Sequence, residues 1–271
     1  MDGWLASESA LRYYTLIGGF GVVAVWEALA PRRVPVPAVA GRWSINIAMT
    51  VLLSIVIAFV FPVLSVGMAI VAQGRGLGLF NRVDAPFAVE CLLAFVALDF
   101  VRYLMHMALH RIGPLWRLHR IHHSDIDYDS TTSLRFHPLE AIVTVGVQLA
   151  AVVALGAPPI AVLVYELATV ILAFFSHGNV RVAPRIDRVL RWFIVTPDMH
   201  RVHHSARVDE SDANFSSVFP WWDRVLRTYR AQPALGHDVM TIGLDDVRDS
   251  RTRSFGWLIG APFGLRRTAP T

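Results

Sequence analysis

The sequence contains no lysine and few charged residues of any kind. Arginine supplies all 25 basic side chains, and charged residues make up 17% of the 271 residues. A soluble globular chain usually carries about a quarter charged residues, whereas here 54% of the residues are hydrophobic. The composition therefore excludes an ordinary soluble domain, a disordered chain and a collagen-like chain, and it predicts an integral membrane protein.

Cysteine is nearly absent as well. The single thiol, Cys91, excludes an internal disulfide framework. The formal net charge is +4, but the arginines are scattered and no basic helix with interleaved aromatic residues indicates a nucleic-acid interface. We interpret the basic residues as loops beside membrane spans that also attract anionic headgroups, and we expect no nucleic-acid partner.

Long apolar runs give the expected architecture. A helix needs about 20 residues to cross the hydrocarbon core of a bilayer. Five runs approach or exceed that length, namely Tyr13–Ala30, Ile45–Ala72, Ala88–Met107, Leu139–Leu155 and Pro159–Ser176. The turn Gly156-Ala157-Pro158-Pro159 joins the last two into a hairpin. We expect an all-α integral membrane protein with four to five apolar spans.

The arginine counts predict an orientation. The loop Pro31–Ser44 holds three arginines and no acid, and the stretch from His177 onward holds 14 arginines against 10 acids. Basic loops stay in the cytoplasm, and counting spans places Leu109–Pro138 there too. The lack of lysine indicates a GC-rich bacterial genome. We therefore expect a multi-pass protein of a bacterial inner membrane, with its C-terminus and a helical cap in the cytoplasm.

Histidine is the abundant residue, and eight of the eleven histidines form three clusters. The clusters are His106 and His110, then His119, His122 and His123, then His200, His203 and His204. Residues three and four apart share one face of a helix, so each cluster presents its imidazoles together. Gly113-Pro114 and Thr196-Pro197-Asp198 precede the second and third clusters and are typical helix starts.

Converging imidazoles indicate a metal site. They cannot all be protonated, because like charges in contact lower one another's pKa. Neutral imidazole binds divalent iron, zinc and copper well. Eight or nine ligands exceed the three to five or so that one ion usually takes. We predict two adjacent metal ions, which can bind dioxygen or activate water; imidazole does not distinguish iron from zinc as the occupant.

Three residues near the clusters are further candidates. His177, at the end of the fifth apolar run, returns to the cluster face through the hairpin, and we expect it to bind metal. His137 is expected either as a ligand or as a donor that orients one. Asn179, two residues after His177, is likewise expected either as a ligand or as a group that orients one.

Asp99 and Tyr103 extend the helical stripe of His106 and His110. An ionisable residue inside a span is costly without a partner. Asp99 can accept the ring N–H of a clustered histidine and so fix its tautomer, or it can pair with Arg102; both interpretations stay open.

The histidine motifs and their flanks resemble the sterol desaturase / fatty acid hydroxylase superfamily. The segments that carry the resemblance are His106–His110, Leu115–Ser124, Arg135–Glu140, Phe175–Asn179, Thr196–Ser205, Trp222–Arg224 and Thr228–Tyr229. The resemblance implies a helical membrane enzyme with a histidine-bound di-iron centre that uses dioxygen and an external electron donor on a lipid. The eight clustered histidines then become catalytic metal ligands, and His177 corresponds to a further ligand.

The expected activity is hydroxylation, or desaturation, of a lipid C–H bond. The three residues between the first two motif histidines favour hydroxylation over acyl desaturation within this superfamily. No flavin, nicotinamide or iron–sulfur fingerprint occurs in the sequence, so we expect a separate electron-transfer protein.

The alternative is a divalent-metal transporter, or a metal-binding membrane protein without oxidase chemistry. Transporter ligands lie near the middle of the membrane, whereas these histidines fall mostly outside the apolar runs. We expect N-terminal membrane spans over residues 1–87, a catalytic domain over 88–230 and a surface tail over 231–271.

Overall fold

A computed structural model describes residues 2–35 and 39–264, and the regular elements in these ranges are helices. The bundle consists of α1 (Asp2–Leu29), α2 (Val39–Val60), α3 (Ser65–Gly74), α4 (Phe87–Arg111), α6 (Pro138–Leu155) and α7 (Pro159–His177), all but α3 long. The cap consists of the short helices α5 (Gly113–His123), η1 (Ser130–Leu134), α8 (Pro184–Leu190), α9 (Pro197–His203), α10 (Val208–Ser211), α11 (Trp221–Val225), η2 (Ser250–Arg253) and α12 (Phe255–Gly264). The expected all-α class is confirmed.

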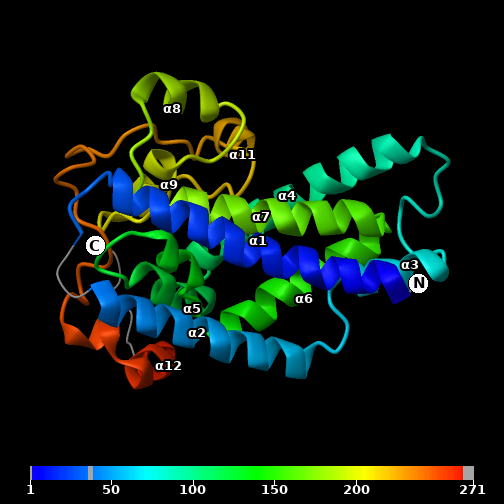
Figure 1. The fold of residues 1–271 in the computed structure, drawn as a ribbon, viewed down its shortest axis with the longest axis horizontal. Coiled ribbons are helices and arrows are strands. Elements are labelled where there is room, and N and C mark those ends of the chain that lie inside the picture. The colour runs from blue at the N-terminus through cyan, green and yellow to red at the C-terminus, as the bar shows by residue number, and fades with distance from the viewer. Residues whose placement is uncertain (1, 36–38, 265–271) are drawn as a thin grey trace.

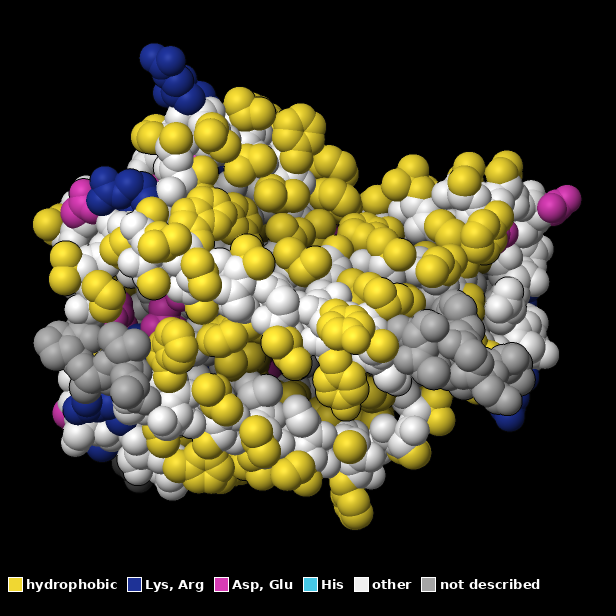
Figure 2. Space-filling view, in the orientation of Figure 1, with side chains coloured by type: hydrophobic (Ala, Val, Ile, Leu, Met, Phe, Trp, Pro, Cys, Tyr) yellow, Lys and Arg dark blue, Asp and Glu magenta, His cyan; other side chains and the backbone are white. Residues whose placement is uncertain are grey.

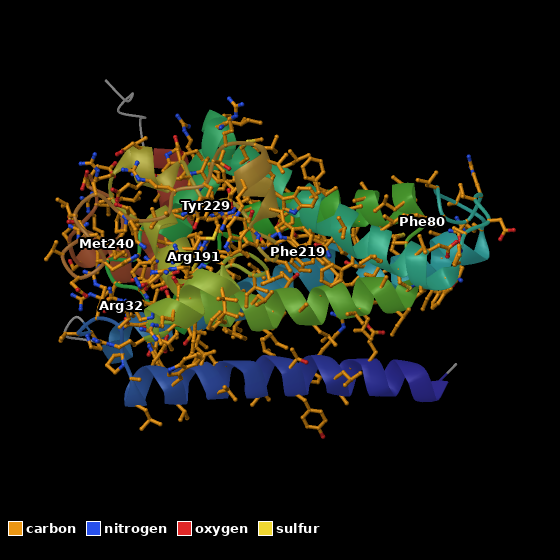
Figure 3. All side chains as sticks on the ribbon, turned by 90° about the horizontal axis from the view of Figure 1, so that it is seen from above. Arg32, Phe80, Arg191, Phe219, Tyr229 and Met240 are labelled. Carbon is orange, nitrogen blue, oxygen red and sulfur yellow. The ribbon has the colours of Figure 1, made fainter. Side chains whose placement is uncertain are left out.

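The long helices form a bundle that carries the short helices at one end (Figure 1). Helix α7 lies at the centre of the bundle and packs against α1, α3 and α4, while α6 packs against α2, α3 and α4. The largest buried apolar cluster lies between α3, α4, α6 and α7 and includes Val66, Leu98, Val152 and Val162. Seen from above, α1 is the outermost layer, and Phe80 lies at the opposite end from Arg32, Arg191 and Met240 (Figure 3).

The outer surface of the bundle is apolar, as a membrane protein requires. Three helical stretches are long and apolar enough to cross a membrane, namely Gly41–Gly74, Pro138–Leu155 and Pro159–His177. Large apolar side chains on them face outward, with Phe59 89% exposed, far more than a soluble protein favours. Figure 2 shows charged side chains mostly at the two ends of the molecule and a hydrophobic band between them. Helices α1 and α4 match the first and third expected spans, and their assignment as spans stays a prediction.

The second expected span, Ile45–Ala72, lies within the apolar stretch Gly41–Gly74, but its helix is broken once. Helix α2 ends at Val60 and α3 begins at Ser65. Pro62 lies between the two helices. Proline has no N–H to donate and disfavours helical backbone at the residue before it, so it accounts for the break. The 22 residues of α2 extend about 33 Å at 1.5 Å per residue, enough to cross the hydrocarbon core alone.

The expected hairpin of the last two spans is present, and glycine shapes its turn. Gly156 ends α6 in the left-handed conformation, with φ of 63°. The loop before α4 packs against this turn so closely that a Cβ on Gly78 would lie 2.1 Å from the nitrogen of Gly156. The turn and this loop therefore close the end of the bundle away from the short helices.

The expected surface tail is wrong for much of residues 231–264. Met240, Ile242 and Leu258 are at most 3% exposed. Ile242 forms a β-bridge with Ser205, and α12 packs against α5 and α2. This segment is part of the folded cap because its apolar side chains cover the histidine-bearing helix α5.

Candidate metal centre

The three histidine clusters lie on the helices that their spacing predicts. His106 and His110 are on the last turns of α4, the second cluster ends α5, and the third lies on α9 and the residue after it. Helix α5 begins at Gly113-Pro114, and α9 begins after Thr196, whose hydroxyl accepts a hydrogen bond from the backbone N–H of Met199. Both predicted helix starts are confirmed.

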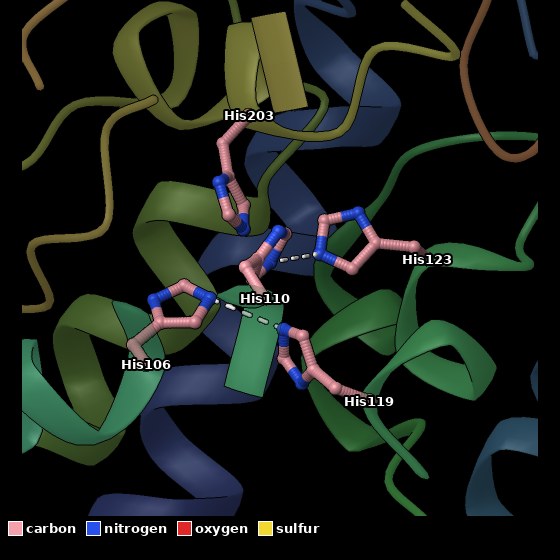
Figure 4. A group of neighbouring side chains, drawn as sticks. All are labelled: His106, His110, His119, His123 and His203. Carbon is pink, nitrogen blue, oxygen red and sulfur yellow. Dashed lines mark hydrogen bonds between the residues drawn. The ribbon is translucent and has the colours of Figure 1, made fainter. Parts of the chain in front are cut away.

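The structure brings nine histidines together as two neighbouring groups. The first group is His106, His110, His119, His123 and His203, and the second is His122, His177, His200 and His204. Within each group one nitrogen per residue lies within 4.8 Å of all the others. Figure 4 shows the rings of the first group turned toward a common centre from α4, α5 and the last residue of α9. All eight clustered histidines and His177 are therefore in place, and metal binding by them stays a prediction.

The histidines of α5 and α9, together with His204, are neutral at physiological pH. Burial first, and then the charges of neighbouring imidazoles, hold their pKa well below the ordinary value. This holds for His119, His122, His123, His200, His203 and His204. Each of these rings therefore keeps a lone pair for a cation.

Backbone carbonyls fix the tautomer of three of the rings. Nδ1 of His106 donates to the carbonyl of Phe215 at 2.7 Å, and Nδ1 of His203 donates to that of Ala213 at 2.8 Å. Nδ1 of His177 donates to a carbonyl on its own helix at 2.8 Å. A carbonyl oxygen only accepts, so the proton resides on Nδ1 and the lone pair on Nε2.

Carboxylates orient two further rings, and the sequence analysis did not single out either acid. Nδ1 of His119 donates to Oε1 of Glu140 at 2.8 Å, and Nδ1 of His110 donates to Oδ1 of Asp212 at 3.1 Å. Glu140 carried a usable signal, because an acid at the start of an apolar span needs a partner. Asp212 carried none, because it lies in an ordinary polar loop.

The facing nitrogens show that the site fits metal ions. Nε2 of His106 lies 3.2 Å from Nε2 of His119, and His110 and His123 face each other at the same distance (Figure 4). Two lone pairs repel at this distance unless a cation lies between them. With metal–nitrogen distances near 2.1 Å, two ligands on one ion lie about 3.0–3.4 Å apart.

The second group shows the same pattern. Nε2 of His177 lies 3.2 Å from that of His122 and 3.1 Å from that of His200. Nε2 of His204 is buried without a hydrogen-bond partner in the described part of the chain. The same is true of Nε2 of His203 in the first group. Such atoms are costly unless a ligand satisfies them. The donor set therefore suits two cations.

His137 and Asn179 have structural roles instead of the expected ones. Nδ1 of His137 caps α6 by accepting from the backbone N–H of Leu139, and Nε2 contacts the carbonyl of Ile259. The side chain of Asn179 pairs with the backbone N–H and carbonyl of Arg33, so it ties the end of α7 to the chain after α1. Both residues belong to helix ends that surround the site, which is why they lie next to the histidine motifs in sequence.

Asp99 binds no histidine, so that interpretation of it is wrong; Arg102 acts on its carboxylate only through charge, without an ion pair within 4.0 Å. Its oxygens accept hydrogen bonds from the backbone N–H groups of Val218 and Phe219 and from Nε1 of Trp222, at 2.8–3.2 Å. These donors come from a loop more than a hundred residues away. Asp99 therefore anchors that loop to α4.

Tyr103 reaches the site through a chain of hydrogen bonds and through the ring of Phe215, which its own ring contacts edge to face. Its hydroxyl bonds to Thr228, whose hydroxyl donates to Asp223. Asp223 in turn accepts from the backbone N–H of Phe215, the residue whose carbonyl holds His106. Tyr103 therefore helps to position a ring that it does not touch.

A cavity of about 380 Å³ adjoins the histidines. It lies between α4, α6 and α7 and is lined by five of the nine rings, including His106 and His122. The apolar part of its wall includes Met105, Leu109, Ala141, Val145 and Val170. Its size and mixed lining are those of a small-molecule site.

With this geometry established, comparison with known proteins identifies the family. The sequence profile of the fatty acid hydroxylase family matches residues 91–228, which is more than half of the chain. The chain belongs to the fatty acid hydroxylase family. The matched range contains all nine histidines of the two groups, and the resemblance found in the sequence is confirmed.

Curated relatives of this fatty acid hydroxylase family member act on several lipids, as their names state. The chain is 34% identical over 152 residues to an alkylglycerol monooxygenase of Caenorhabditis elegans, which covers 55% of this chain and 28% of the relative. It is 29% identical over 150 residues to an ornithine lipid hydroxylase of Rhizobium tropici, covering 55% and 44%. A very-long-chain aldehyde decarbonylase of Oryza sativa is 31% identical over 169 residues, covering 59% and 26%. The matches thus span less than half the length of each of these relatives, and no solved structure matches the sequence.

Proposed function

We propose that the protein is a membrane di-iron oxygenase that hydroxylates a C–H bond of a lipid, with dioxygen as oxidant. The observation that carries this proposal is the pair of histidine groups, five and four rings, at the wall of a cavity between apolar helices. Names of relatives such as the ornithine lipid hydroxylase support the same chemistry. One oxygen atom enters the lipid and the other leaves as water, so the reaction consumes electrons from a donor.

The two histidine groups would hold one iron ion each. Iron with imidazole ligands and open coordination positions supplies oxygen chemistry. The other residues of the chain position these rings. Glu140, Asp212 and the backbone carbonyls hold each Nδ1 proton, so that each Nε2 faces inward. Zinc is an alternative occupant because imidazole binds it equally well.

The cavity would hold the lipid. Its apolar wall excludes water and receives the hydrocarbon part of the substrate, and its histidines place the oxidised carbon beside the metal ions. Because the wall is formed by helices α6 and α7, which are apolar enough to span a membrane, a lipid reaches it from the bilayer.

The membrane arrangement completes the proposal. We propose four to five spans, with the histidine-bearing cap and the C-terminus on the cytoplasmic side of a bacterial inner membrane. The ends of α1, α4 and α7 and the starts of α2 and α6 all lie at the cap end of the bundle (Figure 1), which agrees with a cap on one side. A separate electron-transfer protein would dock on the arginine-rich surface of the cap.

The geometry does not favour a metal transporter. Both histidine groups lie at one end of the bundle, beside the cap helices α5 and α9. A transporter binds its ion near the middle of the membrane, where access alternates between the two sides.

Metal analysis of purified protein tests the proposal. We expect about two irons per chain, oxygen uptake on reduction, and an added oxygen atom in a membrane lipid, measured by mass spectrometry of cells with and without the protein. His122→Asn should lose iron. His137→Asn is the matched control, because asparagine preserves the helix cap and His137 lies outside both groups. Tightly held zinc with no oxygen uptake would contradict the proposal.

A further inference from the structure

Arg102 is a cation on the wall of the cavity without a direct partner. It lies on α4, four residues before His106, and lines the same cavity. No ion pair within 4.0 Å and no hydrogen bond of its guanidinium occurs among the described residues. Ionisable side chains within membrane helices pair with other groups or mark a substrate pathway, because an unpaired charge there is costly.

The other charged groups near Arg102 have partners of their own. Arg12 forms ion pairs with Glu166 at 2.5 Å and with Glu8 at 2.9 Å. Glu140 accepts from His119 through Oε1, and its Oε2 is buried without a hydrogen-bond partner. Asp99, on the same helix as Arg102, has both oxygens occupied by N–H donors. Arg102 is therefore the arginine on this wall whose guanidinium has N–H groups available for a ligand.

Two buried hydroxyls on the same wall also have no partner. The phenol of Tyr165, on α7, and the hydroxyl of Ser216, in the loop that carries Phe215, are each in residues only 1% exposed. Neither oxygen has a hydrogen-bond partner within 3.5 Å in the described part of the chain; the nearest polar side chains are Thr169 beside Tyr165 and Asp223 beside Ser216. Both residues line the cavity with Arg102. A buried hydroxyl without a partner is costly because it has lost its hydrogen bonds to water, so a ligand that satisfies it is favoured.

We infer that Arg102, Tyr165 and Ser216 bind an anionic oxygen group, a carboxylate or a phosphate, at the polar end of the lipid substrate. The guanidinium supplies charge and paired donors, and the two hydroxyls supply further donors. This inference rests on the proposed function for the identity of the substrate as a lipid that is oxidised.

The position of Arg102 also indicates which end of the lipid is oxidised. Residues four apart on a helix share a face and differ by about 6 Å along the axis. A group bound by Arg102 therefore lies about one helical turn from the ring of His106. The oxidised carbon belongs to the polar end of the lipid, and the hydrocarbon chain extends away along the apolar wall.

Binding of matched amphiphiles tests the inference. The probes are a long-chain alkyl phosphate, the fatty acid of the same chain length and the alcohol of the same chain length. Each is titrated calorimetrically into the metal-loaded protein without oxygen, so that no turnover occurs. We expect the wild-type protein to bind at least one anion ten or more times tighter than the alcohol, roughly the effect of a charge-assisted hydrogen bond. The anion that binds tighter identifies the substrate group.

Four variants make the test specific. Arg102→Gln should lose the preference for the anion, Arg102→Lys should keep most of it, and Tyr165→Phe should weaken anion binding several-fold. Arg82→Gln, an exposed arginine before α4, should bind as the wild type does. The inference is overturned if the wild type binds the alcohol as tightly as both anions, or if a folded Arg102→Gln variant keeps the preference.

The two proposals fail in different ways. Because binding is measured without oxygen, anion preference that depends on Arg102 can persist in a protein that takes up no oxygen, which refutes only the oxygenase proposal. Conversely, a protein that oxidises lipids but binds neutral and anionic probes equally refutes only the anion site. With turnover allowed, mass-spectrometric fragmentation of the product should place the new oxygen near the anionic group.

Discussion

Glu140 shows how a residue outside the metal ligands controls the site. It is 2% exposed, and its carboxylate holds the Nδ1 proton of His119. Losing that acceptor charge makes Nε2 of His119 a poorer ligand, so we expect Glu140→Gln to lower metal affinity about 10- to 100-fold. Competition with a chelator measures this. Glu90→Gln, in the first turn of α4, is the control, and equal metal retention in the two variants would argue against the role of Glu140.

Asp99 contributes stability instead of ligand orientation. Its buried carboxylate accepts three N–H groups from the loop that includes Val218 and Trp222. In Asp99→Asn an amide N–H₂ replaces one acceptor and faces donors, so we expect a loss of about 1–3 kcal/mol in the free energy of unfolding. Chemical denaturation in detergent measures it. Asp84→Asn, exposed in the loop before α4, should be neutral, and equal stability of the two variants would contradict this account.

Asp99 and Asp212 show which part of the site the sequence could not predict, and the histidine clusters show which part it could. The spacing within each histidine cluster is local, so the faces of α4, α5 and α9 followed from helical geometry alone. The partners of Asp99 and Asp212 come from segments about a hundred residues away. No periodicity encodes such a pairing, and only the tertiary arrangement reveals it.

At the scale of the element, Gly156 determines how the hairpin of α6 and α7 closes. Its φ is 63°, and a Cβ there would lie 2.6 Å from both the carbonyl of Leu77 and the side-chain amide of Asn81. We expect Gly156→Ala to destabilise the protein by about 1–3 kcal/mol. Thermal unfolding measures the loss.

The matched control for this glycine is Gly18→Ala in α1. A Cβ on Gly18 meets nothing within 4 Å, so alanine should stabilise the helix by about 0.5–1 kcal/mol. Metal content per folded molecule should be unchanged in both variants, because the hairpin turn lies at the opposite end of the bundle from the histidines. A Gly156→Ala variant as stable as the wild type would show that the turn accommodates a side chain.

The elements themselves were largely predictable, and the exceptions have physical causes. The apolar run Ile45–Ala72 hid the break at Pro62, because hydropathy is blind to the lost backbone donor. The segment around Ile242 looked like a surface tail, because its few apolar residues show no period. Its burial depends on the bridge to Ser205, a contact that exists only once α9 is in place.

At the scale of the whole molecule, the orientation of the bundle gives the last prediction. Cys91 is the only cysteine, so a Cys91→Ala background allows single cysteines to be placed at exposed positions. Arg185 lies on α8 in the cap, and Arg82 lies in the loop that packs on the far turn of the bundle; both are exposed.

The excess of arginine around the cap predicts that it stays in the cytoplasm. Arg185→Cys should therefore react with a membrane-impermeant maleimide only in inverted vesicles, and Arg82→Cys only in right-side-out vesicles. Labelling of both positions from the same side would mean that the bundle does not cross the membrane, and the lipid would then have to reach the cavity from one leaflet of a surface-bound enzyme.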